Sequence, residues 1–223
     1  MDTFDTPNQK LYNLINPPTN MELAEGLRNL RAGAMFNLIS VILVLIAIIL
    51  IFAAVGSFPN PNTLISLIAI VGTYILLLIV ASIVGLVGFI LYFKATGNLK
   101  KYNPDYGIGR TGMILQIVGL IIMIASLGFF VASLTRSLGS VERAVLSMFG
   151  FIIVGAVIIV VGVVLFSVML IRLGEIESGF KTAGILYLIG IVLSLIVGGV
   201  GSILGIVSTI LIYTSAGRAL EKL

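Results

Sequence analysis

The sequence AGAMFNLISVILVLIAIIL, residues 32–50, opens the stretch that decides the fold. That stretch runs from Ala32 to Phe93, between Arg31 and Lys94, and its 62 residues include no charged side chain. A helix that spans the hydrocarbon core of a bilayer needs about 20 apolar residues. The stretch therefore predicts two spans, 34–56 and 63–93, and the segment SFPNPN between them is a turn because proline cannot continue a helix. We expect a polytopic membrane protein.

Charged residues bound the later spans in the same way. A third span is expected at 111–135, between Arg110 and Arg136, and a fourth at 144–171, which ends at Arg172. The uncharged stretch 182–217 permits two readings. It forms either one long last helix, for five spans in all, or two short spans at 182–197 and 202–217, for six.

The distribution of positive charge favours six spans. With six spans and a cytoplasmic N-terminus, eleven Lys and Arg residues lie inside and only Arg136 and Arg143 lie outside. With five spans the C-terminal pair moves outside, and the balance falls to nine against four. Cytoplasmic loops carry an excess of Lys and Arg, so the six-span topology is preferred.

Internal repetition gives the same answer. The segments RAGAMFN (31–37), RTGMILQ (110–116) and KTAGILY (181–187) each place a cation, small residues and apolar residues before a polar side chain. The segments that end each pair of spans are also alike: GNL (97–99), GEI (174–176) and GRAL (217–220). Repeats of this kind indicate one structural unit that occurs three times. We therefore predict an all-α bundle of three hairpins at 34–97, 110–174 and 181–217, the third shortened, before a cytoplasmic tail at 218–223.

The chain before the first span divides into two parts. Residues 1–19 are expected to form a polar leader, and residues 20–33 an amphipathic helix that begins at a capping box of Thr19 and Glu22. Leu23, Leu27 and Leu30 fall on one face of this helix. The pattern is typical of a helix that lies at the membrane surface and leads into the first span.

The candidate functional residues are few. Asn37, Gln116 and Tyr187 are polar side chains at matching depth in the three repeats, and we expect intramembrane polar contacts from them. The cations that precede them, Arg31, Arg110 and Lys181, are candidate contacts for lipid headgroups. Close helix packing is expected where small residues recur, as with Gly112 and Gly119 in one span and Gly155 and Gly162 in the next.

The composition disfavours several functions. The chain has neither Cys nor His, which removes thiolate catalysis, disulfides and the commonest metal ligands. The net charge of +4 comes from residues at span ends, so nucleic-acid binding is not expected. No ionisable residue lies deep in a span, and Glu175 and Glu177 are expected to be solvated. We predict no catalytic, cofactor-binding or metal-binding residues, and no enzyme.

The loop KYNPDYGIGR (101–110) and the glycine-rich segment IVGGVGSILG (196–205), with the three repeat starts, resemble a known family. It is a group of uncharacterised crenarchaeal multi-pass membrane proteins classified as a domain of unknown function, DUF973-like. The resemblance implies an archaeal plasma membrane and brings no activity, cofactor or ligand.

Two functional hypotheses follow from glycine-faced helices without reactive groups. The first is a structural or accessory membrane protein that contacts membrane lipid and forms a homo-oligomer or part of a larger membrane complex. The alternative is a permeation protein, a channel or uniporter, for a neutral or weakly polar solute. Its path would be lined by Asn37, Gln116 and Tyr187.

Overall fold

A computed structural model describes residues 20–56, 64–136, 141–197 and 199–223, and these residues form helices without a strand. The polar leader at 1–19, the whole expected first turn at 57–62, residues 137–140 and Gly198 lie outside the described residues. The elements are α2 (Asn20–Gly56), α3 (Leu64–Tyr102), the 3₁₀ turn η2 (Pro104–Tyr106), α4 (Gly107–Arg136), α5 (Val141–Leu173), α6 (Ser178–Val197) and α7 (Gly199–Glu221).

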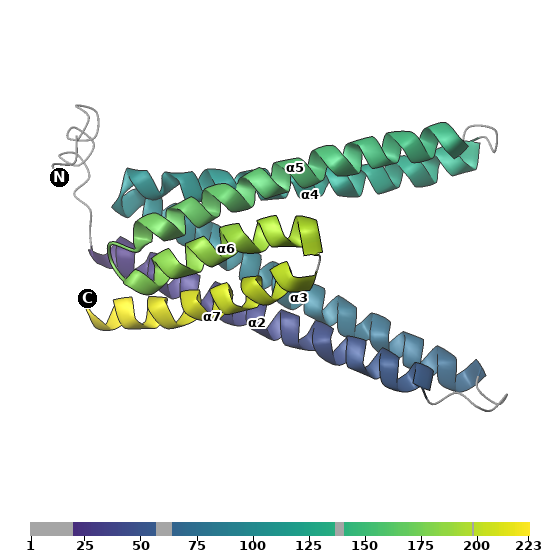
Figure 1. Cartoon of the computed structure of the whole chain (residues 1–223), viewed down its shortest axis with the longest axis horizontal. Helices are drawn as coiled ribbons and strands as arrows, with labels where there is room; N and C mark the ends of the chain where they lie inside the picture. The colour runs from purple at the N-terminus through teal and green to yellow at the C-terminus, as the bar shows by residue number, and fades with distance from the viewer. Residues whose placement is uncertain (1–19, 57–63, 137–140, 198) are drawn as a thin grey trace.

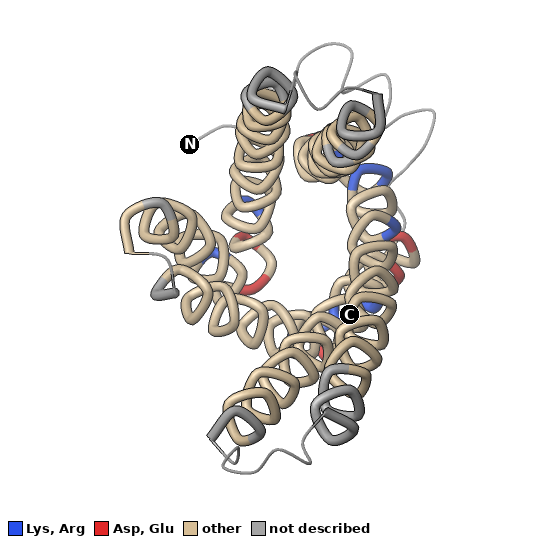
Figure 2. Tube along the Cα trace, turned by 90° about the vertical axis from the view of Figure 1, so that its right-hand side faces the viewer, with Lys and Arg blue, Asp and Glu red and all other residues tan. Residues whose placement is uncertain are grey.

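The helices pack as three antiparallel hairpins, α2–α3, α4–α5 and α6–α7 (Figure 1). The described chain ends lie at one end of the molecule, which we call the base; the tips are the opposite ends of the hairpins. Figure 1 shows the two long hairpins diverging from the base toward their tips, with the short hairpin between them. Viewed from the tips, the three hairpins point to three different sides of the molecule (Figure 2), and contacts of α7 with α2 and of α5 with α6 join them.

The stretch 182–217 does not form one long helix. Its two helices fold back on each other, since the Ser208 hydroxyl donates a hydrogen bond to the Ala183 carbonyl at 2.7 Å. Gly190 and Gly201 face one another near the tip, where a Cβ on Gly190 would lie 3.2 Å from the Gly201 carbonyl oxygen. Because α7 begins at Gly199, the turn is shorter than the expected break at 198–202.

Residues 20–33 do not form a helix of their own. They continue without a break into the first long helix, and Leu23, Leu27 and Leu30 are buried in the core. Leu99, at the end of α3, packs against Gly26 on this part of α2. An apolar stripe on a helix shows only that something apolar covers it, and here the cover is protein.

The connections at the base are also shorter than the sequence indicates. The expected polar loop 94–107 is helical through Tyr102, and only Asn103 and η2 separate α3 from α4. The Asn103 side chain accepts a hydrogen bond from the Asp105 backbone at 3.0 Å and so caps η2. Lysines favour the last turn of a helix, which explains why Lys100 and Lys101 end α3 instead of forming a loop.

The hydrophobic core lies at the base. Its fully buried members come from every hairpin and include Leu27, Leu99, Met169, Phe180 and Ile212. Away from the base, large apolar side chains are exposed along both long hairpins; Ile49 in α2 is 65% exposed and Ile153 in α5 is 61% exposed. Side chains of this kind are stable in such positions when hydrocarbon surrounds them.

Five described helical segments are long and apolar enough to cross a membrane: Asn20–Ala53, Gly72–Tyr102, Pro104–Phe130, Met148–Leu173 and Gly201–Glu221. Helix α6 contributes a shorter apolar stretch, Ser178–Ser194. The length and composition of these helices are those of a membrane protein.

Candidate functional site

The three hairpins are joined at the base by contacts between repeat starts and repeat ends. The first of these contacts links the first hairpin to the third. The guanidinium carbon of Arg31 lies 4.9 Å from the centroid of the Tyr213 ring, and its Nη2 lies 3.4 Å from the Tyr213 hydroxyl. The same guanidinium lies against Gly217, where its carbon would be 3.4 Å from an added Cβ.

The other two repeat starts make the corresponding contacts. Arg110 lies over the Phe93 ring, with 5.4 Å between its guanidinium carbon and the ring centroid, and contacts Gly97. Lys181 packs on Gly174, where its Cβ would lie 2.6 Å from an added Cβ. Each of the three glycines therefore leaves room for a cation that begins a different hairpin.

These contacts form a closed cycle. The first residues of the second hairpin contact the end of the first hairpin, and those of the third contact the end of the second. The first residues of the first hairpin contact the end of the third. Two of these links follow from the short connections at the base, but Arg31 and Tyr213 are 182 residues apart. The three-fold sequence repeat is therefore a three-fold arrangement in space, with its third unit shortened. The sequence showed the repeat, whereas the cyclic order of the contacts depends on the fold.

Within the hairpins, facing glycines bring helices into contact. A Cβ on Gly112 would lie 2.5 Å from the Gly162 carbonyl oxygen, and one on Gly119 would lie 2.6 Å from the Gly155 carbonyl oxygen. The predicted packing seam at these four positions is confirmed, and it joins α4 to α5. Gly128, on the same helix, has no atom within 4 Å of its Cβ position and so is not part of the seam.

The structure brings two of the three candidate polar residues together. Asn37 and Tyr187 line one cavity of about 320 Å³ between α2, α6 and α7, and Ser40 and Thr209 also line it. The Tyr187 hydroxyl lies 3.4 Å from the Thr209 hydroxyl. The Asn37 amide oxygen packs against Gly88 of α3, 2.8 Å from the position of an added Cβ.

Gln116 lies elsewhere. It lines an apolar groove of about 600 Å³ between α3 and α4, and its amide donates to the Met113 sulfur at 3.8 Å on its own helix. The three polar residues occupy matching positions in the repeat but do not surround one path. Gln116 sits at the junction of the first and second hairpins, whereas Asn37 sits at that of the third and first.

Aromatic rings lie at the base between the polar cavity of Asn37 and the apolar groove of Gln116. The rings of Tyr92 and Phe166 are 5.4 Å apart between centroids, and Phe166 meets Tyr187 edge-on at 6.2 Å. Tyr92 and Phe166 are buried. The Tyr92 hydroxyl is enclosed, and among the described residues no group meets hydrogen-bond geometry with it. The three rings therefore pack the first, second and third hairpins against one another at the base.

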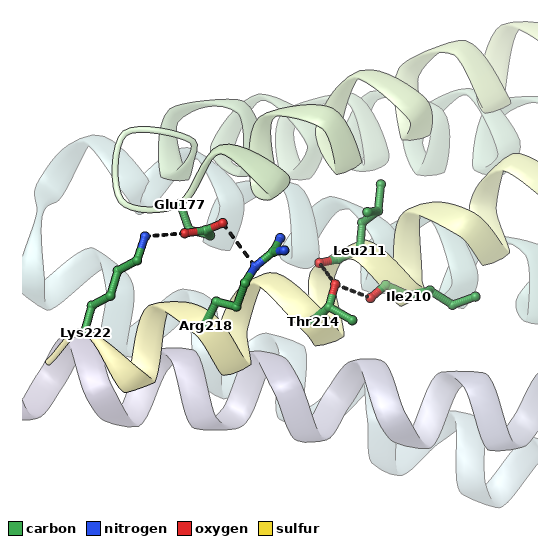
Figure 3. A network of polar contacts seen from close by, with 6 residues as sticks. All are labelled: Glu177, Ile210, Leu211, Thr214, Arg218 and Lys222. Atoms are coloured by element: carbon green, nitrogen blue, oxygen red, sulfur yellow. Dashed lines mark hydrogen bonds and ion pairs between the residues drawn. The ribbon is translucent and has the colours of Figure 1, made fainter.

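One carboxylate at the base is buried and paired. Glu177 lies in the α5–α6 turn with its side chain 10% exposed, and it accepts a hydrogen bond from Lys222 and pairs with Arg218 at 3.2 Å (Figure 3). The hydrogen bond from Lys222, opposed by burial and reinforced by the charges of Lys222 and Arg218, lowers the pKa of Glu177 below its usual value. The expectation that Glu177 is solvated is therefore wrong. The α6–α7 hairpin brings the end of α7 against this turn, a contact that local sequence does not contain.

Among the described residues, no three His, Cys, Asp or Glu side chains lie together as a metal site would require. The described residues offer features suited to binding: exposed cations at the base, a small polar cavity and an apolar groove.

Comparison with known proteins gives one match. Residues 23–223 match the model of a family described as a protein of unknown function, DUF973. No curated protein and no solved structure matches the chain.

Proposed function

The chain belongs to the DUF973 family of unknown function, and we propose that it is a non-enzymatic scaffold, an accessory subunit of a membrane assembly. Its base joins three hairpins, and its tips offer apolar helix faces to a partner within the membrane. The resemblance noted in the sequence adds an archaeal plasma membrane to this proposal.

The observation that carries the proposal is the shortened third hairpin. Helices α6 and α7 have 20 and 23 residues, whereas α2 to α5 have 30 to 39. The long hairpins therefore extend beyond the third, and they diverge there (Figure 1). In lipid, helices associate through close packing of complementary faces. Because the third hairpin is shorter, space remains beyond its tip that helices of another subunit, or of a second copy, can fill.

The proposed topology is six spans with the base in the cytoplasm. Ten described Lys and Arg residues lie toward the base, and only Arg136 and Arg143 lie toward the tips, which agrees with the positive-inside rule. The uncharged part of α3, residues 64–93, is about 45 Å long at 1.5 Å per residue. A helix of this length crosses a bilayer core of about 30 Å by tilting and by extending into the headgroup regions, which bring the bilayer to about 40–45 Å. Tilting from a common base makes the long hairpins diverge. The uncharged part of α6, residues 182–197, is about 24 Å long, so in this topology α6 crosses where the bilayer thins around the short hairpin.

Permeation is the second candidate, because the cavity lined by Asn37 and Tyr187 is polar. Two features disfavour it. Gln116 lines a different groove, and the packed rings of Tyr92 and Phe166 lie between that groove and the polar cavity. The polar cavity is better explained as the place where polar side chains of α2, α6 and α7 find hydrogen-bond partners within the protein.

Photo-crosslinking in the native membrane tests the scaffold proposal. A crosslinking amino acid replaces Ile49 or Phe149, which are exposed toward the tips, and a matched control replaces Met21, which is exposed at the base. We expect protein adducts from the tip positions, and copurification of the same adduct partner in mild detergent. A monodisperse protein whose tip positions crosslink to lipid alone would contradict the proposal.

A further inference from the structure

The groove between α3 and α4 has the walls of a hydrocarbon site. Its volume is about 600 Å³, and Phe89, Ile90 and Phe93 of α3 face Ile117 and Leu120 of α4 across it. Pockets of this volume are typical of small-molecule sites. The groove begins where the two helices part, just beyond their contact at the base.

An unpaired cation stands at the base end of this groove. Arg110 lies over the ring of Phe93, which itself lines the groove. No described carboxylate lies within 4 Å of Arg110, since the ion pairs among the described residues both use Glu177. The Lys100 side chain lies along the start of α4, against Gly107, and adds a second positive charge to this side of the base. A guanidinium binds a phosphate through two parallel N–H donors.

We propose that this groove binds an anionic phospholipid, with its phosphate on Arg110 and one acyl chain along Phe93 and Phe89. The polar and apolar parts of the site lie in the order that a lipid requires, headgroup at the base and chain toward the tips. Phe93 connects them, because one ring contacts both the cation and the groove.

The other two junctions between hairpins do not offer this site. Between α5 and α6 the helices are in contact, and a Cβ on Gly184 would lie 2.6 Å from the Ser167 carbonyl oxygen. Between α7 and α2 the cavity is smaller, at about 320 Å³, and lined by polar groups such as Asn37 and Thr209. The α3–α4 junction therefore combines an apolar groove with an unpaired cation.

The volume also argues against a partner helix in the groove. A helix with its side chains is at least 10 Å across and rises 5.4 Å per turn, so 600 Å³ holds only about one and a half turns of it. An acyl chain is much narrower. The lipid site rests on the membrane location alone and not on the scaffold role, so the two proposals can fail separately.

Fluorescence quenching in vesicles tests the site directly, because the chain has no Trp. Phe89→Trp places the only reporter in the groove, and Val87→Trp, at a similar depth on the opposite side of α3 and 37% exposed, is the matched control. Each full-length variant is reconstituted in phosphatidylcholine with increasing brominated phosphatidylglycerol or brominated phosphatidylcholine. If Phe89→Trp does not fold, Ile117→Trp reports from the opposite wall.

We expect the groove reporter to show about fivefold stronger association with the anionic lipid than with the zwitterionic lipid, the ratio that one cation near the surface supplies. The ratio should fall to about one in Arg110→Gln and persist in Arg28→Gln, which removes an exposed cation of the base that lies on α2. Val87→Trp should be quenched equally by both lipids, which also shows membrane insertion independently of the site. Equal quenching at both positions, a preference that survives Arg110→Gln, or a groove reporter that neither lipid quenches would overturn the proposal.

Discussion

Arg31 and Tyr213 are 182 residues apart in the chain, yet the guanidinium carbon of one lies 4.9 Å from the ring centroid of the other. This contact closes the cycle of hairpins, because it joins the start of the first to the end of the third. The two other contacts of the cycle are between segments that short connections already hold together. The contact between Arg31 and Tyr213 is thus the one that depends on the whole chain being folded.

The contact between Arg31 and Tyr213 should stabilise the fold measurably. Cation–π contacts at exposed sites contribute about 0.5 to 1 kcal/mol, and a double-mutant cycle isolates that energy. We expect Arg31→Ala and Tyr213→Ala to couple by this amount in the free energy of unfolding, measured in mixed detergent micelles. The cycle of Arg28→Ala with Tyr213→Ala is the control and should show no coupling. Equal coupling in both cycles would assign the effect to net charge.

Two glycines of α4 should respond in opposite ways to the same substitution. In Gly112→Ala the new methyl group would lie 2.5 Å from the Gly162 carbonyl oxygen, so the helices must separate, and overpacking of this kind costs about 1 to 3 kcal/mol. Gly128→Ala has open space around the methyl group and gains up to about 1 kcal/mol of helix propensity. Thermal unfolding in detergent compares them. Equal stability of the two variants would show that the seam is not tight.

Local sequence contained the helices and the seams but not the arrangement of the hairpins. The uncharged stretch 32–93 predicts two helices because charge and proline act locally, and the seven-residue spacing of Gly112 and Gly119 places both on one helix face. By contrast, the leucine face at 23–30 could be covered by lipid or by protein, and only the packed base decides this. Asn37 and Gln116 have the same place in the repeat, yet the cyclic arrangement puts them at different junctions.

Acid should weaken the base through Glu177. Its pKa is lower in the folded protein than in the unfolded chain, for which about 4.5 is the usual value. A lowered pKa means that the ion pairs contribute stability above about pH 4.5 and that this stability is lost as pH falls through the folded pKa. We expect the melting temperature of the natural protein to drop on acidification from pH 6 to pH 3, and to drop less in Glu177→Gln. Glu175→Gln, at an exposed neighbouring position, should keep the full drop; a loss of pH dependence there as well would contradict the assignment.

The C-terminus and the α6–α7 turn should be accessible to a thiol reagent from opposite sides of the membrane. The natural chain has no cysteine, so an impermeant thiol reagent reports on each introduced cysteine alone. A cysteine added after Leu223 should resist the reagent in intact cells and react after permeabilisation, because the proposed topology places the base and its ten cations in the cytoplasm. Gly199→Cys, at the start of α7, should react from outside if α6 crosses, and Gly56→Cys, at the end of α2, is the control for an outside position.

Protection of Gly199→Cys with labelling of Gly56→Cys would make α6–α7 a hairpin that enters the bilayer without crossing it. Labelling of the added C-terminal cysteine from outside would contradict the six-span topology. If α6 and α7 both cross the membrane, the C-terminus must lie on the same side as the start of α6.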